Sequence, residues 1–549
     1  MMIAKTLLLA TLAVPIAMLF ACLLRPVRDR MLTWLALAPA PGLLAAMLAT
    51  GNPSLILDES RLQFTLMLDA PGRMLLGVAA LLWIASGAYA AAYLRGKPNG
   101  ARFALCWLLT LTGSLGVFIS ADLASFYISF ALVSLAAYGL VVHDGTPHAK
   151  YAGVVYLVLA VIGEILLLLA FALLAAAVPG DSLAIRDAVA ALPTSPWRGM
   201  ALGLLIAGFG VKAGLLPLHV WLPIAHPAAP MPASAVLSGA IIKAGIIGLI
   251  RFLPFESALP EWGAALAALG QLTAFYGVAV GLTQVNPKTV LAYSSMSQMG
   301  IVATVLGMAL AAGHDDAVIG ATFYAAFHVL TKGALFLAVG VVAMSGFRRY
   351  WTTLVPVGVL ALSFGGLPLT GGFLAKLAVK TPLGEGFVGH LAPVSAIGSA
   401  LLMTHFLHRL VSAATQEPKA PAQVGLSLPW LTMAFASIAV PWTLFRVAGI
   451  GAIADALSPT ALWSATWPVS AGLVLGVGLA RWGRLLPRVP EGDLVILEVR
   501  AARAILAWGT PLERVEGAFR HWTIAGLSLL AVALILGVAL FGSGFAPAR

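Results

Sequence analysis

The chain has 549 residues, of which 61% are hydrophobic and 10% are charged. A soluble domain could not bury that much apolar surface, so the composition predicts a polytopic membrane protein. The net charge of +11 lies between the apolar runs, which is typical of membrane topology and gives no reason to expect nucleic acid as a partner.

Runs of about 20 apolar residues, each long enough to cross a bilayer as a helix, recur along the whole chain. They predict an all-α protein with about 14–16 transmembrane helices, the first of them retained rather than cleaved as a signal peptide. The predicted cores are residues 3–24, 31–50, 72–94, 103–120, 122–142, 151–177, 199–222, 231–253, 263–284, 288–312, 318–344, 353–380, 391–413, 426–448, 462–481 and 521–543.

Basic residues gather on one side of this arrangement. They follow odd-numbered spans, at Arg25, Arg28, Arg30, Arg95, Lys97, Arg102, Arg348, Arg349, Arg481, Arg484 and Arg488. Acidic residues dominate the opposite side, at Asp58, Glu59, Asp181, Glu256, Glu261, Asp315, Asp316 and Glu385. Because the positive side faces the cytoplasm, the sequence predicts a multi-pass protein of a bacterial inner membrane with both termini outside.

Lys212 lies in an apolar run that carries no other charge back to Arg198. Their 14-residue separation spans about 21 Å as a helix, and a bilayer core is about 30 Å thick, which places Lys212 near mid-membrane. An ammonium group there costs at least about 2.5–3.5 kcal/mol, so such residues are usually functional. Pro217 and Pro223 follow and predict a broken helix near 212–223, the arrangement from which ion paths are built.

A second interrupted segment, SFGGLPLTGGFLAK, carries glycines and a proline before Lys376 and predicts a broken helix near 363–376. Two such segments indicate two five-helix repeats, although a chance pair is an alternative. The expected division of the chain is N-terminal helices at 1–100, a first repeat at 101–255, a second at 260–415, and C-terminal helices at 420–549. Residues 487–520 mix arginine and glutamate with large apolar residues and predict an amphipathic cytoplasmic segment.

Further ionisable residues lie deep inside apolar runs. They are Glu164, Lys243, Lys376 and the pair His328 and Lys332, whose i,i+4 spacing puts both on one helix face. A buried lysine can exchange its proton near neutral pH, and histidine titrates there without help. With Lys212, these residues predict a lateral proton relay; each could alternatively be a structural hydrogen-bonding group.

Three other polar residues, His219, Ser294 and Ser297, are candidates for lining this path, although helix packing is the stronger interpretation of the two serines. The isolated cysteines Cys22 and Cys106 form no metal-ligand pattern. No glycine-rich nucleotide loop is evident, so we expect no metal, no cofactor and no catalytic site in this chain.

Four stretches carry a resemblance to a known family: residues 212–245, 291–300, 327–337 and 365–376. With them the chain resembles the antiporter-like subunits of the respiratory complex I superfamily. The run LPLHVWLPIAHPAAP followed by SGAIIKAGIIG is most similar to the membrane subunits of hydrogenase-4 and formate hydrogenlyase.

The resemblance implies two inverted five-helix repeats, each with a broken helix, and translocation of protons or sodium ions along a central polar axis. It implies that the lysine of the first broken helix is Lys212 and the base of the second is Lys376, with Lys243, His328 and Lys332 between them. It also implies a larger membrane complex of the hydrogenase or NADH/quinone dehydrogenase type, whose partners perform any redox chemistry.

One departure from the family pattern concerns the fifth helix. Such subunits carry a Trp-Glu pair there, and this chain has Phe130 and Ala131 instead. Either Glu164, one span later, replaces the carboxylate, or the coupling differs, or the subunit does not pump. The missing glutamate keeps three alternatives open: the membrane half of an inorganic-carbon uptake system, a stand-alone cation/proton antiporter, and a scaffold that transports nothing.

Overall fold

The computed structural model describes residues 2–57, 64–344, 350–414, 424–482, 489–492 and 494. The chain divides into two units, Met1–Gly492 and Asp493–Arg549. The predicted span at 521–543 and most of the predicted amphipathic segment at 487–520 lie outside the described residues.

Thirteen continuous helical stretches in the described part of the chain are long and apolar enough to cross a membrane. They are α1 (Met2–Ala21), Arg25–Leu48 (α2, Arg25–Trp34, with α3, Ala40–Leu48), α4 (Ala70–Tyr93), α5 (Gly100–Ile119), α6 (Leu123–Val141), α7 (Pro147–Ala177), Met231–Phe252 (α11, Met231–Val236, with α12, Lys243–Phe252), α13 (Pro260–Gly281), α14 (Pro287–Ala312), α15 (Asp316–Met344), α18 (Phe387–Ala414), α19 (Val424–Val447) and α21 (Pro459–Trp482). With the two interrupted segments described below, they account for every predicted span except the last. The predicted all-α membrane fold is confirmed.

Side-chain caps set the start of several of these helices. Asp69 accepts a hydrogen bond from the Gly72 amide at 2.8 Å before α4, and Asp122 accepts one from the Ser125 amide at 2.7 Å before α6. Each cap satisfies an amide that has no partner inside the helix. The helix boundaries therefore follow from local sequence.

The first interruption separates α9 (Arg198–Ala213) from α10 (Trp221–Ala228). Helix α9 ends because Gly214 adopts a left-handed conformation, with φ of +78°. The indole of Trp221 donates to the Val211 carbonyl at 2.8 Å and holds α10 against the end of α9. Lys212 therefore lies in the last turn of α9, where the helix dipole favours a cation.

The second interruption separates α16 (Tyr350–Ser363) from α17 (Gly371–Leu383). Gly366 in the turn has a φ of +95°, and a Cβ there would lie 2.8 Å from Cδ of Lys376. The glycine thus leaves room for the lysine stem to fold back along the break. Each interrupted segment is the fourth of the five spans of its predicted repeat.

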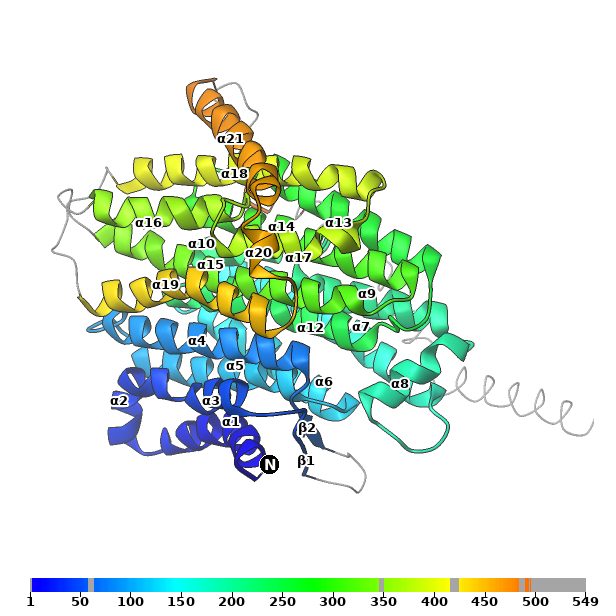
Figure 1. The fold of residues 1–549 in the computed structure, drawn as a ribbon. Helices are drawn as coiled ribbons and strands as arrows, with labels where there is room; N and C mark the ends of the chain where they lie inside the picture. The colour runs from blue at the N-terminus through cyan, green and yellow to red at the C-terminus, as the bar shows by residue number, and fades with distance from the viewer. Residues whose placement is uncertain are drawn as a thin grey trace, which may run out of the picture. The chain divides into compact units, whose positions relative to one another are not determined.

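The core lies around the stretch Met231–Phe252, where 100% of the most apolar segment is buried. It also includes α15 and α14, where 89% and 83% of the corresponding segments are buried. Helices α1 and α21 are peripheral, each with 22% of the corresponding segment buried. Figure 1 shows α4, α5, α15 and α19 running side by side. A helix buried on all faces is one that can carry polar groups away from lipid.

The smaller elements lie at the ends of the long helices. They are α8 (Ile185–Ala191), α20 (Ile453–Ala456), and the antiparallel strands β1 (Ser54–Ile56) and β2 (Thr65–Met67). The hairpin is not part of the predicted pattern; strands this short give too little alternation to stand out from flanking apolar runs.

Candidate functional site

Lys212 is buried, at 4% exposure, and its ammonium donates to the Tyr156 hydroxyl of α7 at 3.1 Å. That hydroxyl donates in turn to the Ser134 carbonyl of α6 at 2.7 Å. The ring of Phe130 lies 5.9 Å from the ammonium. A bonded chain of two polar groups therefore links the first helix break to α6.

Glu164 of α7 belongs to the same group of side chains. It is 7% exposed, lies near Ser134, and interacts electrostatically with Lys212. Among the described residues, its carboxylate oxygens have no hydrogen-bond partner, and no ion pair within 4.0 Å joins it to Lys212. We call Ser134, Tyr156, Glu164 and Lys212 the first-half cluster.

Lys243 and His328 form the closest contact between predicted site residues. The Lys243 ammonium lies 2.5 Å from Nδ1 of His328 and donates to the Ser238 carbonyl at 3.1 Å. A π-helical turn, Leu237–Ile241, precedes Lys243, and such turns recur at functional sites because they free backbone carbonyls. Both side chains have 0% exposure. Two protonated groups at this distance would repel strongly, so the pair can hold one proton between them.

Lys332 lies one helical turn beyond His328 on α15. Its ammonium donates to the Leu291 carbonyl of α14 at 2.8 Å and stands 4.8 Å from the Phe364 ring centroid. The ring of Phe364 is also 5.7 Å from that of His328. Phe364, the first residue of the second helix break, thus packs near both Lys332 and His328.

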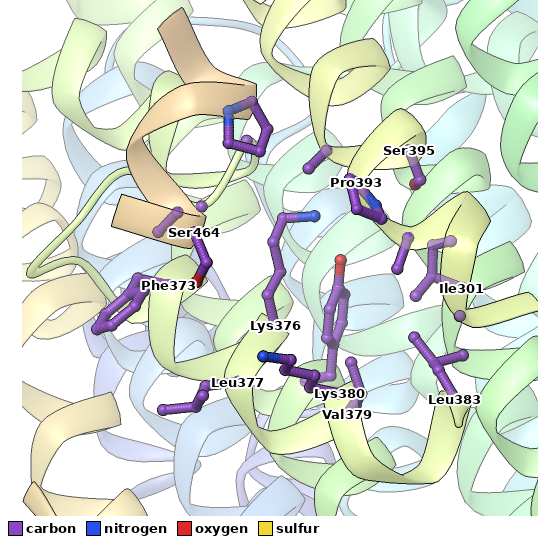
Figure 2. Close-up of a pocket in the computed structure, with 18 of the residues that line it drawn as sticks. Ile301, Phe373, Lys376, Leu377, Val379, Lys380, Leu383, Pro393, Ser395 and Ser464 are labelled. Atoms are coloured by element: carbon purple, nitrogen blue, oxygen red, sulfur yellow. The ribbon is translucent and has the colours of Figure 1, made fainter. Parts of the chain in front are cut away.

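Lys376 of α17 lines a cavity of about 210 Å³ between α13, α14, α15, α17, α18 and α21. Figure 2 shows its side chain extending between Ser464 of α21 and Pro393 of α18. Tyr324, which shares the α15 face of His328 and Lys332 through successive spacings of four, lines the same cavity and donates to Gln298 at 2.6 Å. The α15 face therefore runs from the central pair to the cavity.

The three candidates for path lining lie beside these groups. His219 follows the first break, with Nδ1 3.2 Å from the Pro217 carbonyl and its ring 5.5 Å from Tyr276. Ser294 is 3.9 Å from the Met403 sulfur of α18, and Ser297 packs against Gly277 of α13. The two serines thus occupy faces of α14 that pack on other helices.

Several polar residues near the site had no strong sequence signal. Tyr156 and Ser238 contact Lys212 and Lys243 directly, and Ser295 bonds Ser238 at 2.7 Å. His226 has 0% exposure and stacks on Phe336 at 4.6 Å. Tyrosine and serine are common in membrane helices, so only their contacts distinguish them. The position of His226, inside α10 and close to the prolines of the first break, is the one available signal.

Lys288 is a buried lysine that the sequence analysis did not select. It is 6% exposed, and its ammonium donates to the carbonyls of Ala229 at 2.5 Å and Pro227 at 3.3 Å, at the end of α10. It opens α14, directly after the connecting segment. Because it is the first residue of the predicted span 288–312, it resembles a surface lysine at a helix end.

We call Lys212, Lys243, His328, Lys332 and Lys376 the polar row; the first four are buried and Lys376 is half-buried. Among the described residues, Lys243 and His328 are the only members of the row that are hydrogen-bonded to each other. The described residues also include no group of three or more His, Cys, Asp or Glu side chains that could hold a metal ion. The row thus brings titratable side chains together within the apolar helices.

Comparison with known proteins identifies the central part of the chain. Residues 120–383 match the family model described as NADH:quinone oxidoreductase/Mrp antiporter, TM. The chain is 31% identical over 370 residues to NADH-quinone oxidoreductase subunit N of Desulforudis audaxviator, covering 63% of this chain and 72% of that protein. It is 30% identical over 340 residues to hydrogenase-4 component B of Escherichia coli, covering 57% and 50%.

A solved structure, the Mrp complex from Dietzia sp., contains a chain with the same fold. The TM-score is 0.75 at 22% identity, covering 100% of this chain and 63% of that one. This chain spans about half the length of some curated relatives, including 55% of an uncharacterized protein of Mycobacterium tuberculosis that is 33% identical over 355 residues.

Proposed function

This chain belongs to the antiporter-like membrane subunits of the respiratory complex I superfamily, and from that premise we propose that it translocates protons across the membrane. In this proposal it acts as one subunit of a larger membrane complex, and partners supply the driving reaction. Relatives named as NADH-quinone oxidoreductase and hydrogenase-4 components support the assignment to such a complex.

The contact between Lys243 and His328 carries the proposal. At 2.5 Å the two groups can hold one proton between them, and both lie on helices that are buried on nearly every face. When a second proton binds to one partner, the other partner must release the proton that it holds. Two positive charges cannot coexist at that distance in a low dielectric. The pair can therefore act as a one-proton station between α12 and α15.

On either side of this station, the proposed path uses the rest of the row. Toward the first break it reaches Lys212, and toward the second it passes from His328 along the α15 face through Tyr324 to Lys376. Lys332 lies one turn on the other side of His328. No direct hydrogen bond bridges these steps among the described residues, so water must complete the path. Broken helices and π turns expose the carbonyls that hold such water.

Glu164 is the proposed acidic partner of Lys212. The family places a glutamate on the preceding helix, where this chain has Ala131. Glu164 is buried and interacts electrostatically with Lys212 from the α7 side. Its negative charge can stabilise the protonated lysine, and loss of that charge would favour release of the lysine's proton.

The proposed domain organisation follows the two breaks. Residues 101–255 form a first repeat and residues 260–415 a second, related by inversion, between N-terminal helices at 1–100 and C-terminal helices at 420–549. In the proposed orientation the arginine-rich segments face the cytoplasm of a bacterial cell, and both termini face outward. Single cysteines placed before α1 and in the segment after α15 should react with a membrane-impermeant reagent from opposite sides.

Reconstitution tests the proposed function. The chain, purified with any partners that remain bound, is placed in liposomes carrying an imposed pH gradient, and internal pH is followed with a dye. Lys212→Ala should slow proton flux at least about tenfold. Lys150→Gln, which removes an exposed lysine near the start of α7, is the matched control and should keep full flux. Full flux in Lys212→Ala would remove Lys212 from the path.

The carboxylate missing at Ala131 favours a second candidate, the membrane subunit of an inorganic-carbon uptake system, since such a role needs different coupling from a redox pump. Co-purification separates the candidates. Iron–sulfur or nickel–iron proteins indicate a redox complex, whereas a soluble zinc protein indicates carbon uptake. A chain that purifies alone and still carries protons indicates a stand-alone antiporter.

A further inference from the structure

Two lysines of α17 line the Lys376 cavity: Lys376 is half-buried and Lys380 is exposed. Lys376 and Lys380 are spaced i,i+4 and so share one face of the helix. Neither ammonium has a hydrogen bond or ion pair with another residue in the described part of the chain. No described residue that lines the cavity is an aspartate or glutamate. Like charges at this spacing destabilise a helix unless an anion lies between or beside them.

The other walls of the cavity supply neutral donors and apolar surface. Gln271 and Ser395 contribute an amide and a hydroxyl, Tyr324 contributes a hydroxyl oxygen whose proton is donated to Gln298, and Phe373, Leu377 and Leu383 contribute apolar surface. A water molecule needs about 10–15 Å³ of such space. The cavity volume of about 210 Å³ therefore leaves room for a polyatomic anion together with water.

The cavity also opens at the edge of the bundle. Helix α21, which closes one side through Ser464, Ala465 and Pro468, has only 22% of its most apolar segment buried, and α18 has 33%. Figure 2 shows Lys376 and Lys380 on α17, with Ser464 to the left of the Lys376 side chain and Pro393 to the right of it in this view. Because these two helices are mostly exposed in the described part of the chain, a molecule from the bilayer can reach the cavity from their side.

We propose that this cavity binds the phosphate group of an anionic phospholipid, with Lys376 and Lys380 as the two cationic contacts and the apolar wall against an acyl chain. Phosphate presents several acceptor oxygens, so it can take charge-assisted hydrogen bonds from both ammoniums at once. Basic pockets between transmembrane helices are suited to such head groups. A free inorganic phosphate would use the same two lysines without the apolar wall.

Lipid retention tests the proposal without measuring transport, so its outcome is separate from that of the proposed function. The purified chain is exchanged into detergent, titrated with phosphatidylglycerol or with zwitterionic phosphatidylcholine, and analysed by native mass spectrometry. Phosphatidylglycerol should be retained selectively. Lys380→Gln should weaken retention about tenfold, and the double change with Lys376→Gln should weaken it further.

Two further variants separate the site from general effects. Ser464→Phe should obstruct the cavity from α21 while leaving both lysines in place, and should also lower retention. Lys150→Gln removes an exposed lysine elsewhere and should retain lipid normally. Thermal unfolding confirms that each variant is folded.

The competing outcomes are distinct. If inorganic phosphate at millimolar concentration displaces the lipid, the two share one phosphate site, as proposed. Equal retention of both lipids would overturn the proposal. Retention unchanged by Lys380→Gln and by the double variant would overturn it as well, and so would an inorganic phosphate site with no lipid bound.

Discussion

The ammonium nitrogen of Lys243 lies 2.5 Å from Nδ1 of His328, although 85 residues separate them in sequence. Lys243 begins α12 after a π-helical turn, and His328 lies in the middle of α15. The contact therefore joins the last helix of the first predicted repeat to the third helix of the second.

This contact predicts strong coupling between the two residues. Lys243→Ala and His328→Ala should each reduce proton flux at least about tenfold, and the double variant should lose little more, since either change removes the shared-proton station. Flux in reconstituted liposomes measures all three variants. Losses that multiply in the double variant would show that the residues act independently.

The first-half cluster predicts that Glu164 acts with Lys212. Glu164→Gln keeps the shape of the side chain but removes its charge, so it should reduce flux about as much as Lys212→Ala. Glu385→Gln, in an exposed segment between α17 and α18, is the matched control. Flux unaffected by Glu164→Gln would contradict replacement of the family glutamate by Glu164.

Gly366 allows the second break to accommodate Lys376. Gly366→Ala should destabilise the protein by about 1–2 kcal/mol from the left-handed conformation alone. The clash with the Lys376 stem, where a Cβ would lie 2.8 Å from Cδ, should add to this. Gly145 has a φ of +66° and no atom within 4 Å of an added Cβ, so Gly145→Ala measures the conformational part by itself. Equal losses in unfolding midpoint would indicate that Lys376 moves freely aside.

Arg251, in the last turn of α12, joins this helix to the start of α4 and the end of α5. It is paired with Asp69 at 3.0 Å and donates to the carbonyls of Val117 at 3.0 Å and Phe118 at 2.7 Å. Arg251→Met should destabilise the protein toward the lower end of about 3–5 kcal/mol, because Asp69 is partly exposed. Arg251→Lys should rescue little, since one ammonium cannot reproduce the fork of donors. Thermal unfolding in detergent measures both, and full rescue by lysine would show that only the charge matters.

His143, in the turn between α6 and α7, predicts a contribution of pH to stability. Burial of its ring lowers the pKa of His143; Asp144 opposes this shift, and Arg102 and Lys97 add to it. The folded state therefore favours the neutral ring. This contribution is present above the unfolded pKa of about 6.5 and is lost as pH falls toward the lower folded pKa.

His143→Phe should remove that dependence. The ring packs edge-on against Phe103 at 5.0 Å, a contact that phenylalanine can keep. The fall in unfolding midpoint between about pH 7 and pH 5 should be smaller in this variant than in the parent chain. An identical fall would assign the acid sensitivity to other groups.

The sequence alone determined the membrane class, the positions of the described spans and the two helix breaks. Apolar run length, proline, glycine and capping residues are local signals, because each acts on the backbone within a few residues. The burial of Lys212, Lys243, His328 and Lys332 could be predicted for the same reason. Lys288 was missed because its burial comes from α10, a different part of the chain.

Only the tertiary structure decided which groups meet. Packing between helices distant in sequence brings Glu164 of α7 near Lys212 and selects the hydroxyl to which Lys212 donates. The same packing brings Lys243 into contact with His328. Hydropathy contains little of that information, since nearly every residue on these helices is apolar and no stripe marks the partner face. The cavity that Lys376 and Lys380 share likewise exists only where six helices come together.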